Sequence, residues 1–164
     1  MDISVTPGRL SFNGKVYRYA IGRRGISSSK KEGDGITPAG TFALRKVLYR
    51  PDRVQKPKTD LPIEPLGRND AWCDDINCPA YNTQVKLPHN GSFEELWRED
   101  DLYDILAVVG YNDAPPVPGK GSAIFLHIAR PEYTPTAGCI ALKKEDLIEV
   151  LAAAGPNTML AING

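Results

Sequence analysis

The sequence predicts a mostly β fold of the α+β kind, with one or two short helices, in a single domain that spans residues 1–164. Three observations support this prediction. The chain of 164 residues is long enough for one substantial hydrophobic core and too short for two. Most apolar runs are strand-sized, and only one segment shows clear helical periodicity. The 14 prolines are typical of a fold with long irregular loops.

The first quarter of the chain is predicted to be β structure. Residues 9–12 and 15–21 are alternating runs around an Asn-Gly pair at 13–14, which is a strong hairpin signal. Residues 22–35 are rich in glycine and charge and predict a loop. Residues 41–49 follow and predict another strand.

The middle of the chain is irregular. Residues 51–91 show little periodicity and contain six prolines, and a structureless stretch of that length usually carries function or covers a site. Beyond it, Ser92 as N-cap and Glu95 at the capping-box position predict a short helix through Trp97 towards Leu102.

The last third predicts buried strands and the one clear helix. Residues 105–109 and 123–129 are apolar runs of strand length, separated by a proline- and glycine-rich loop at 113–121. Residues 143–154 have helical spacing of apolar side chains and end at a Gly-Pro pair, which predicts an amphipathic helix. Residues 158–162 predict a closing strand.

Charge and composition exclude several classes of partner. Twenty basic and twenty acidic residues cancel, and no large basic cluster is present, which argues against nucleic acid or an anionic membrane surface as a partner. The longest apolar runs are too short to span a bilayer, so no membrane insertion is expected. The N-terminus has Asp2 where a signal peptide would be basic and then apolar. We therefore expect a cytoplasmic protein, or a periplasmic one if the sequence lacks its leader.

The three cysteines are an odd number for a disulfide framework. Cys73 and Cys78 stand close together in a polar segment, and we expect them to be unpaired thiols in a reducing compartment. A zinc site would need a second pair of ligands, and His89 is the only spare imidazole. We therefore expect no metal and no cofactor.

The third cysteine, Cys139, stands apart in an apolar run directly after Gly138. A glycine there lets the backbone bend so that the Gly138 and Cys139 amides can converge on a developing oxyanion. A free cysteine is only a few per cent thiolate at neutral pH and needs a base. His127 ends an apolar strand upstream and can supply that base. On these residues alone, a buried structural thiol and a satisfied core histidine remain the alternatives.

Two segments hold these residues, 121–127 (GSAIFLH) and 136–142 (TAGCIAL), and further characteristic stretches lie at 32–42, 81–82, 97–104 and 110–112. Together they resemble the YkuD-type L,D-transpeptidase family, and more closely its ErfK/YbiS/YcfS/YnhG-like branch, with the two segments matching the catalytic segment. The resemblance covers nearly the whole chain. It implies a β-sandwich or barrel domain with a long irregular loop.

The resemblance implies a cysteine enzyme that acts on peptidoglycan stem peptides or muropeptides. Cys139, deprotonated by His127, would attack the carbonyl on the L-centre of diaminopimelate in a stem tetrapeptide, with the oxyanion on the Gly138 and Cys139 amides. D-Ala would leave with a proton from His127, and a thioester would remain. Water resolves that thioester in an L,D-carboxypeptidase, and an amine resolves it in an L,D-transpeptidase. Carbapenem-type inhibitors are expected to acylate the same thiol.

The sequence departs from the wider family beside the cysteine. Most members have Ser-His-Gly-Cys and then Arg or Asn two residues past the cysteine, whereas here Ala137 and Ala141 take those places. Residues that usually shape the acceptor side are therefore missing. We expect a carboxypeptidase in peptidoglycan recycling. An L,D-transpeptidase is the alternative within the class, and a non-catalytic muropeptide-binding module is the alternative outside it.

Further residues are candidates for substrate contacts, each with an ordinary structural alternative. Arg130 can hold a substrate carboxylate or lie in an exposed loop, and Thr136 can contact substrate or cap its loop. His89 lies in the long loop that resembles the family's site-covering segment, or is a surface residue. The remaining candidates can line the cleft or serve turns and core, and they are Tyr81, Asn82, Tyr111, Asn112 and Trp97.

Overall fold

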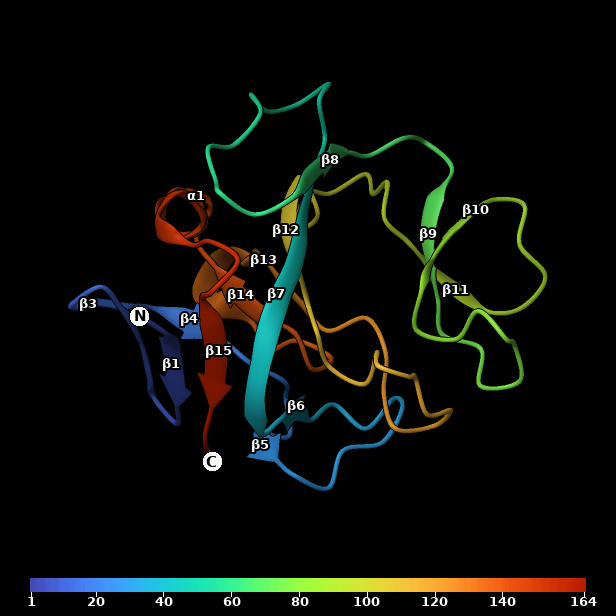
Figure 1. Ribbon diagram of the computed structural model, residues 1–164, viewed down its shortest axis with the longest axis horizontal. Helices are drawn as coiled ribbons and strands as arrows, with labels where there is room; N and C mark the ends of the chain where they lie inside the picture. The colour runs from blue at the N-terminus through green and yellow to red at the C-terminus, as the bar shows by residue number, and fades with distance from the viewer.

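A ten-stranded sheet forms the centre of the computed structural model, which describes residues 1–164 (Figure 1). The strand order is β3-β2-β1-β15-β7-β12-β13-β14-β4, with β8 paired to β7. The strands at the two ends, β3 and β4, are separated in the chain by Arg18 alone. The sheet must therefore curl back on itself, and it forms a nearly closed barrel. Its strands are β1 (Ile3–Thr6), β2 (Arg9–Phe12), β3 (Lys15–Tyr17), β4 (Tyr19–Ala20), β7 (Gly40–Tyr49), β8 (Ile63–Pro65), β12 (Ile105–Val109), β13 (Phe125–Ile128), β14 (Ile140–Leu142) and β15 (Met159–Ile162).

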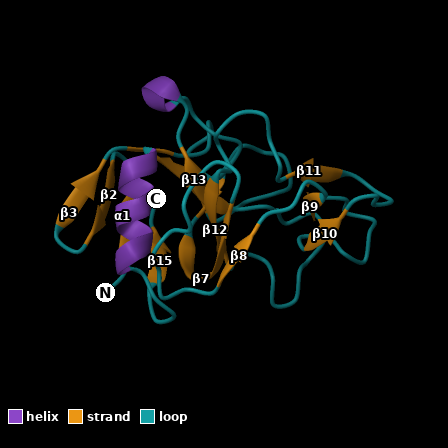
Figure 2. Cartoon of the chain, turned by 90° about the horizontal axis from the view of Figure 1, so that it is seen from above, coloured by secondary structure: helices purple, strands orange, loops and turns teal.

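Two smaller sheets and one α-helix complete the fold. A two-stranded sheet pairs β5 (Ile26–Ser27) with β6 (Thr37–Pro38). A three-stranded sheet has the order β10-β9-β11, and Figure 2 shows it at the opposite end of the molecule from the helix α1. We call residues 70–95, which hold this sheet, the lobe. Its strands are β9 (Asp70–Cys73), β10 (Gln84–Lys86) and β11 (Phe93–Glu95), while α1 spans Lys144–Ala153 and a 3-10 turn spans Pro131–Tyr133.

The mostly β fold is confirmed, and so are most of the elements outside the middle of the chain. The Asn-Gly turn joins β2 to β3, and both of its residues have the positive φ that such a turn requires. The predicted strands at 41–49, 105–109, 123–129 and 158–162 correspond to β7, β12, β13 and β15. The predicted amphipathic helix is α1, which buries Leu147, Val150 and Leu151. No helix is long and apolar enough to cross a membrane.

The predicted helix beyond Ser92 is wrong. Phe93–Glu95 is strand β11, which pairs with β9, and the chain continues in turns. The Ser92 hydroxyl donates to Asp74 Oδ1 at 2.7 Å, so it holds a neighbouring loop and caps no helix. Residues 51–91 are also more regular than expected, because they contain β8, β9 and β10. These strands have three or four residues each, which is too short for an alternating pattern to be visible among the prolines.

Two hydrophobic clusters lie on the two faces of the sheet, and β13 contributes to both. Leu126 and Ile128 belong to the larger cluster, which α1 covers. Phe125 belongs to the smaller cluster, together with Trp72 of the lobe and Cys139. Because side chains alternate along a strand, His127 lies on the same face as Phe125. The functional candidates are therefore on the face that looks towards the lobe.

Candidate active site

Neighbouring parallel strands carry Cys139 and His127 to one cavity. In the register of β13 and β14, His127 is opposite Ala141, and Cys139 stands two residues before Ala141 on the same face. Both side chains are buried, and both line a cavity of about 470 Å³. A cysteine and an imidazole at one cavity are the two groups that thiol-dependent acyl transfer needs.

The Cys139 thiol is fully paired with the backbone. Its Sγ donates to the carbonyl oxygen of Ala123 at 3.2 Å and accepts from the N–H of Phe125 at 3.4 Å. Ala123 has a φ of +54°, which is an uncommon value for a residue with a side chain. In this conformation its carbonyl oxygen accepts the hydrogen bond from the Cys139 thiol. Burial, followed by the charge of Glu94, raises the pKa of Cys139 to about 12. The resting group is therefore a neutral thiol.

His127 is held as a neutral base. Its Nδ1 is 2.8 Å from the carbonyl oxygen of Ile128, which can only accept, so Nδ1 carries the proton and Nε2 is free to receive one. The Tyr103 ring packs against the imidazole edge-to-face, with centroids 5.3 Å apart. Burial lowers the pKa of His127 to about 4. At neutral pH the two groups are thus a neutral thiol and a neutral imidazole.

The loop before Cys139 requires glycine at position 138. Gly138 has a φ of +143°, and a Cβ there would lie 2.9 Å from the carbonyl oxygen of Ile36. Thr37 Oγ1 donates to the Gly138 carbonyl at 2.8 Å and accepts from the N–H of Gly22 at 2.8 Å. The Thr37 hydroxyl therefore links the cysteine loop to the backbone at Gly22.

The two amides predicted to form the oxyanion hole differ in their partners. The Gly138 N–H donates to Thr136 Oγ1 at 3.0 Å, and the Thr136 hydroxyl donates in turn to the Cys139 carbonyl at 2.6 Å. The Cys139 N–H has no acceptor within the chain. The Cys139 amide is therefore the donor that is ready for an oxyanion. Thr136 caps its own loop and also lines the cavity.

A comparison with known families agrees with this geometry. The family model described as YkuD, L,D-transpeptidase catalytic domain, matches residues 4–162. The chain belongs to the YkuD family. It is therefore a cysteine L,D-transpeptidase-type enzyme domain, and peptidoglycan stem peptides are the substrates of that family. The finer ErfK/YbiS/YcfS/YnhG-like assignment stays a prediction. Searches of curated proteins and of solved structures return no match.

Three basic side chains line the cavity of this YkuD domain, and two of them form ion pairs with carboxylates. Lys30 is buried and forms an ion pair with Asp34 at 3.0 Å, and Arg98 forms one with Asp100 at 2.7 Å. Arg130 lines the same cavity, is exposed, and forms no ion pair. Arg130 is therefore the cavity cation that is free to bind an anion.

Acidic groups lie on the other walls of the cavity. Glu94 of β11 accepts a hydrogen bond from the Tyr103 hydroxyl, and burial raises the pKa of this carboxyl. Glu32 accepts from the hydroxyls of Tyr81 at 2.7 Å and Ser122 at 2.6 Å. Asp74 is the third acidic residue of the lining. A cavity with both signs of charge suits a zwitterionic peptide.

Four of the predicted substrate contacts lie behind the cavity wall. Asn82 Oδ1 accepts from Trp72 Nε1 and the Ala123 N–H, and its Nδ2 donates to the carbonyls of Tyr111 and Asn112. The Tyr81 hydroxyl accepts from the Gly121 N–H. Asn112 Nδ2 donates to the carbonyls of Val117 and Gly121, and the Tyr111 hydroxyl donates to the Lys120 carbonyl. These side chains hold residues 120–123, and so position the carbonyl that meets the Cys139 sulfur.

The structure places Trp97 and His89 outside the cavity lining. Trp97 lies beneath the guanidinium of Arg50, 3.5 Å from the ring centroid. His89 lies in the lobe beside Cys78. Of the predicted contacts, Arg130 and Thr136 line the cavity with Cys139 and His127.

Sequence reasoning missed five residues that shape the site. Lys30, Glu94, Arg98 and Tyr103 line the cavity, and the Tyr103 ring packs on His127. Thr37 holds the loop before Cys139. Thr37, Arg98 and Tyr103 had a visible signal, because they fall in the 32–42 and 97–104 stretches that resemble the family. Lys30 and Glu94 reach the cavity through long-range contacts that local patterns do not reveal.

Proposed function

We propose that this YkuD domain is an L,D-carboxypeptidase that releases the terminal D-Ala of a stem tetrapeptide through a thioester on Cys139. The observation that carries the proposal is the lining beside the sulfur. Ala137 and Ala141 both line the cavity, so a methyl group stands where the wider family has larger polar side chains. Water needs only space and a base at the thioester, whereas an amine acceptor must also be bound and oriented.

The charges of the cavity fit a stem tetrapeptide. Its terminal D-Ala carries a free carboxylate, and the unpaired guanidinium of Arg130 is suited to bind it. The diamino acid carries an ammonium group, for which Glu94 and Asp74 of the lobe offer carboxylates. A peptide held between these two walls would present its L,D-bond across the face of Cys139 and His127.

The proposed reaction starts from the neutral Cys139 thiol and the neutral His127 imidazole. As Cys139 Sγ attacks the carbonyl carbon, its proton passes to His127 Nε2, and the oxyanion accepts the Cys139 N–H. The imidazolium then protonates the departing amine of D-Ala as the carbon–nitrogen bond breaks, and the thioester remains. His127 next takes a proton from water, hydroxide adds to the thioester carbon, and the thiol leaves as the tripeptide carboxylate forms.

The test incubates the protein with disaccharide-tetrapeptide, with and without a large excess of a free D-amino acid. We expect disaccharide-tripeptide and D-Ala as the main products in both reactions. Cross-linked or D-amino-acid-exchanged peptide as the main product would contradict the proposal and support a transpeptidase. Peptide binding without turnover would support a non-catalytic module.

Two variants and a second substrate sharpen the assay. Cys139→Ala should abolish turnover, and Ala137→His, which restores the family's residue, should increase the share of exchanged product. Intact sacculi, compared with soluble muropeptides, test the recycling role. A clear preference for the soluble substrate is the outcome that recycling predicts.

A further inference from the structure

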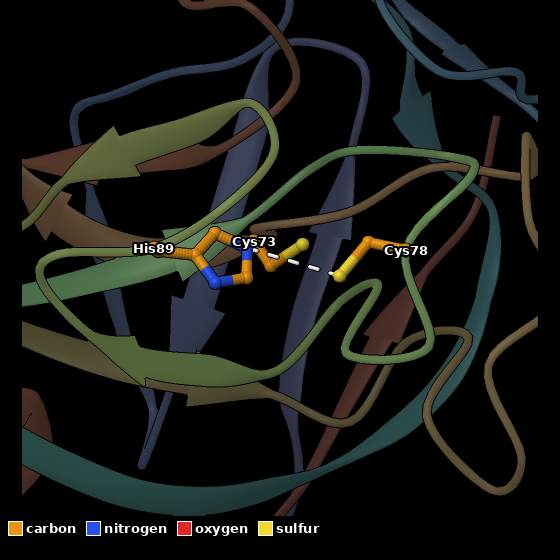
Figure 3. A group of neighbouring side chains, drawn as sticks. All are labelled: Cys73, Cys78 and His89. Atoms are coloured by element: carbon orange, nitrogen blue, oxygen red, sulfur yellow. Dashed lines mark hydrogen bonds between the residues drawn. The ribbon is translucent and has the colours of Figure 1, made fainter.

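Three metal-ligating side chains meet in the lobe, apart from the residues that the mechanism uses. Cys73, Cys78 and His89 each point a ligand atom towards the others, as Figure 3 shows, and the three atoms lie within 4.8 Å of one another. Cys78 Sγ is 3.9 Å from His89 Nε2. Both cysteines are free thiols.

The first loop of the lobe is folded so that the two cysteines face each other. Cys73 ends β9, and the N–H of Asn82 donates to its carbonyl at 2.8 Å, which closes the loop between them. Inside that loop the N–H of Cys78 donates to the Asp75 carbonyl at 3.0 Å, and the N–H of Tyr81 donates to the Cys78 carbonyl at 3.0 Å. These backbone bonds fix the main chain at Cys78 and leave its Sγ directed towards His89.

The second loop of the lobe supplies the imidazole. His89 lies between β10 and β11, and Ser92, three residues on, is tied to the first loop by its hydroxyl on Asp74 and its N–H on Asp75. The His89 and Phe93 rings also pack edge-to-face, with centroids 6.4 Å apart. The three ligand atoms therefore come from the end of β9 and from two loops that hydrogen bonds join to each other.

The sequence predicted no metal, but the fold brings three ligands together, and three protein ligands with a water in the fourth position can hold zinc. We propose that Cys73, Cys78 and His89 form a Zn²⁺ site. Thiolate and imidazole are the ligands that zinc prefers. With Zn–S and Zn–N bonds of about 2.3 and 2.1 Å, tetrahedral geometry sets sulfur and nitrogen ligands about 3.6 Å apart, close to the 3.9 Å between Cys78 Sγ and His89 Nε2. The other two separations, which are within 4.8 Å, must also contract for the ion to bind all three atoms. Cys73 is buried, whereas Cys78 and His89 are partly exposed, so the ion enters from solvent and keeps water in its fourth position.

The two loops of the lobe have few buried side chains that could stabilise them. Between residues 74 and 95, only Tyr81 and Asn82 are buried, so the two loops have almost no apolar core of their own. The same segment supplies Asp74, Phe93 and Glu94 to the wall of the cavity. Zinc that joins the two loops would stabilise this wall, because an ion that binds only the folded arrangement adds its binding free energy to folding.

The test titrates the reduced, metal-free protein with Zn²⁺ against a chromogenic chelator, and with Co²⁺ to record thiolate-to-metal charge transfer. We expect one Zn²⁺ per chain and a charge-transfer band with Co²⁺. Mutation of a residue that hydrogen-bonds to a metal ligand typically lowers metal affinity about 10–100-fold. Loss of a direct ligand in Cys78→Ser or His89→Gln should therefore lower Zn²⁺ affinity by at least about tenfold. Cys139→Ser is the matched control, which removes the other thiol and should leave both signals unchanged.

A second readout locates the ion. Hydrogen exchange within residues 74–95 should slow when Zn²⁺ is added to the wild-type protein, and should not change in His89→Gln. Because His89 is partly exposed, this variant tests the site even if Cys78→Ser does not fold. The proposal is overturned if reduced protein binds no Zn²⁺, if affinity is unchanged in folded His89→Gln, or if Cys139→Ser abolishes binding. A Cys73–Cys78 disulfide with no zinc affinity after reduction would equally overturn it.

Discussion

The two walls of the cavity are built in different ways. On the barrel wall, Cys139 and His127 are buried, and backbone atoms hold each of them at short range. On the lobe wall, Asp74 and Glu94 are partly buried and Phe93 is 37% exposed. We infer that the proposed reacting groups lie on the more deeply buried wall, where small errors in geometry are costly, and that the lobe contributes binding. Changes to Cys139 and its loop should therefore lower kcat, and changes to the lobe wall should raise KM.

The largest effect is expected at the nucleophile. Cys139→Ser keeps a hydroxyl that can donate to the Ala123 carbonyl, so the fold should be retained. The hydroxyl is a far weaker nucleophile, and kcat should fall on the order of 10³-fold or more. Release of D-Ala and thermal unfolding should be measured together. A variant that retains a tenth of the activity would show that the barrel wall does not carry the chemistry.

The second prediction concerns the buried imidazole and pH. The folded pKa of His127, about 4, lies below the ordinary value of 6.5, so between these values the unfolded chain binds more protons than the folded one. Stability is therefore fully present above pH 6.5 and is lost as the pH falls towards 4, by on the order of 3 kcal/mol from this residue. Denaturant unfolding at a series of pH values should show a smaller acid loss in His127→Gln than in wild type. Equal losses would contradict the burial argument.

The third prediction separates the cysteine loop from an ordinary turn. Gly138→Ala introduces both a strained φ and a contact at 2.9 Å with the Ile36 carbonyl, whereas Gly119, with a φ of +87°, has nothing within 4 Å of an added Cβ. Strain of this kind costs on the order of 1–3 kcal/mol. We expect Gly138→Ala to be less stable than Gly119→Ala and to lose on the order of tenfold in kcat. Equal stability and activity of the two variants would mean that the cysteine loop tolerates a side chain.

The smallest effect is expected on the lobe wall. Phe93→Ala removes an exposed ring at the cavity and leaves both reacting groups untouched. It should raise KM several-fold, roughly the effect of one partly buried aromatic contact, with kcat close to wild type. Steady-state kinetics on the tetrapeptide measure both constants, with Phe93→Leu as the conservative control. A fall in kcat with KM unchanged would reverse the assignment of the two walls.

The barrel was easier to predict than the lobe for a physical reason. Strands such as β7 and β12 are five residues or longer, so their apolar patterns are visible in sequence. The lobe strands are three or four residues long and are held by contacts between loops, and Ser92 was misread as a helix cap because its hydroxyl partner, Asp74, is 18 residues away.

In the candidate site, too, local sequence features were visible and contacts between distant residues were not. The sequence indicated Cys139, Gly138 and His127 as candidates because the glycine–cysteine pair and the family resemblance are local in sequence, and the structure places Cys139 and His127 at one cavity. The Ile128 carbonyl that orients His127 is adjacent, but only the folded backbone shows that it faces Nδ1. The roles of Thr37 and Asn82 depend on hydrogen bonds to residues far along the chain, and no local pattern encodes such bonds.

The most direct test of the account is the site of acylation. The protein is incubated with a carbapenem, and intact-protein mass spectrometry is followed by peptide mapping, with Cys139→Ser and Cys78→Ser as matched variants. A single adduct on Cys139, absent from Cys139→Ser and retained in Cys78→Ser, is the predicted result. An adduct on Cys78, or no adduct on a protein that still releases D-Ala, would contradict a thioester mechanism at Cys139.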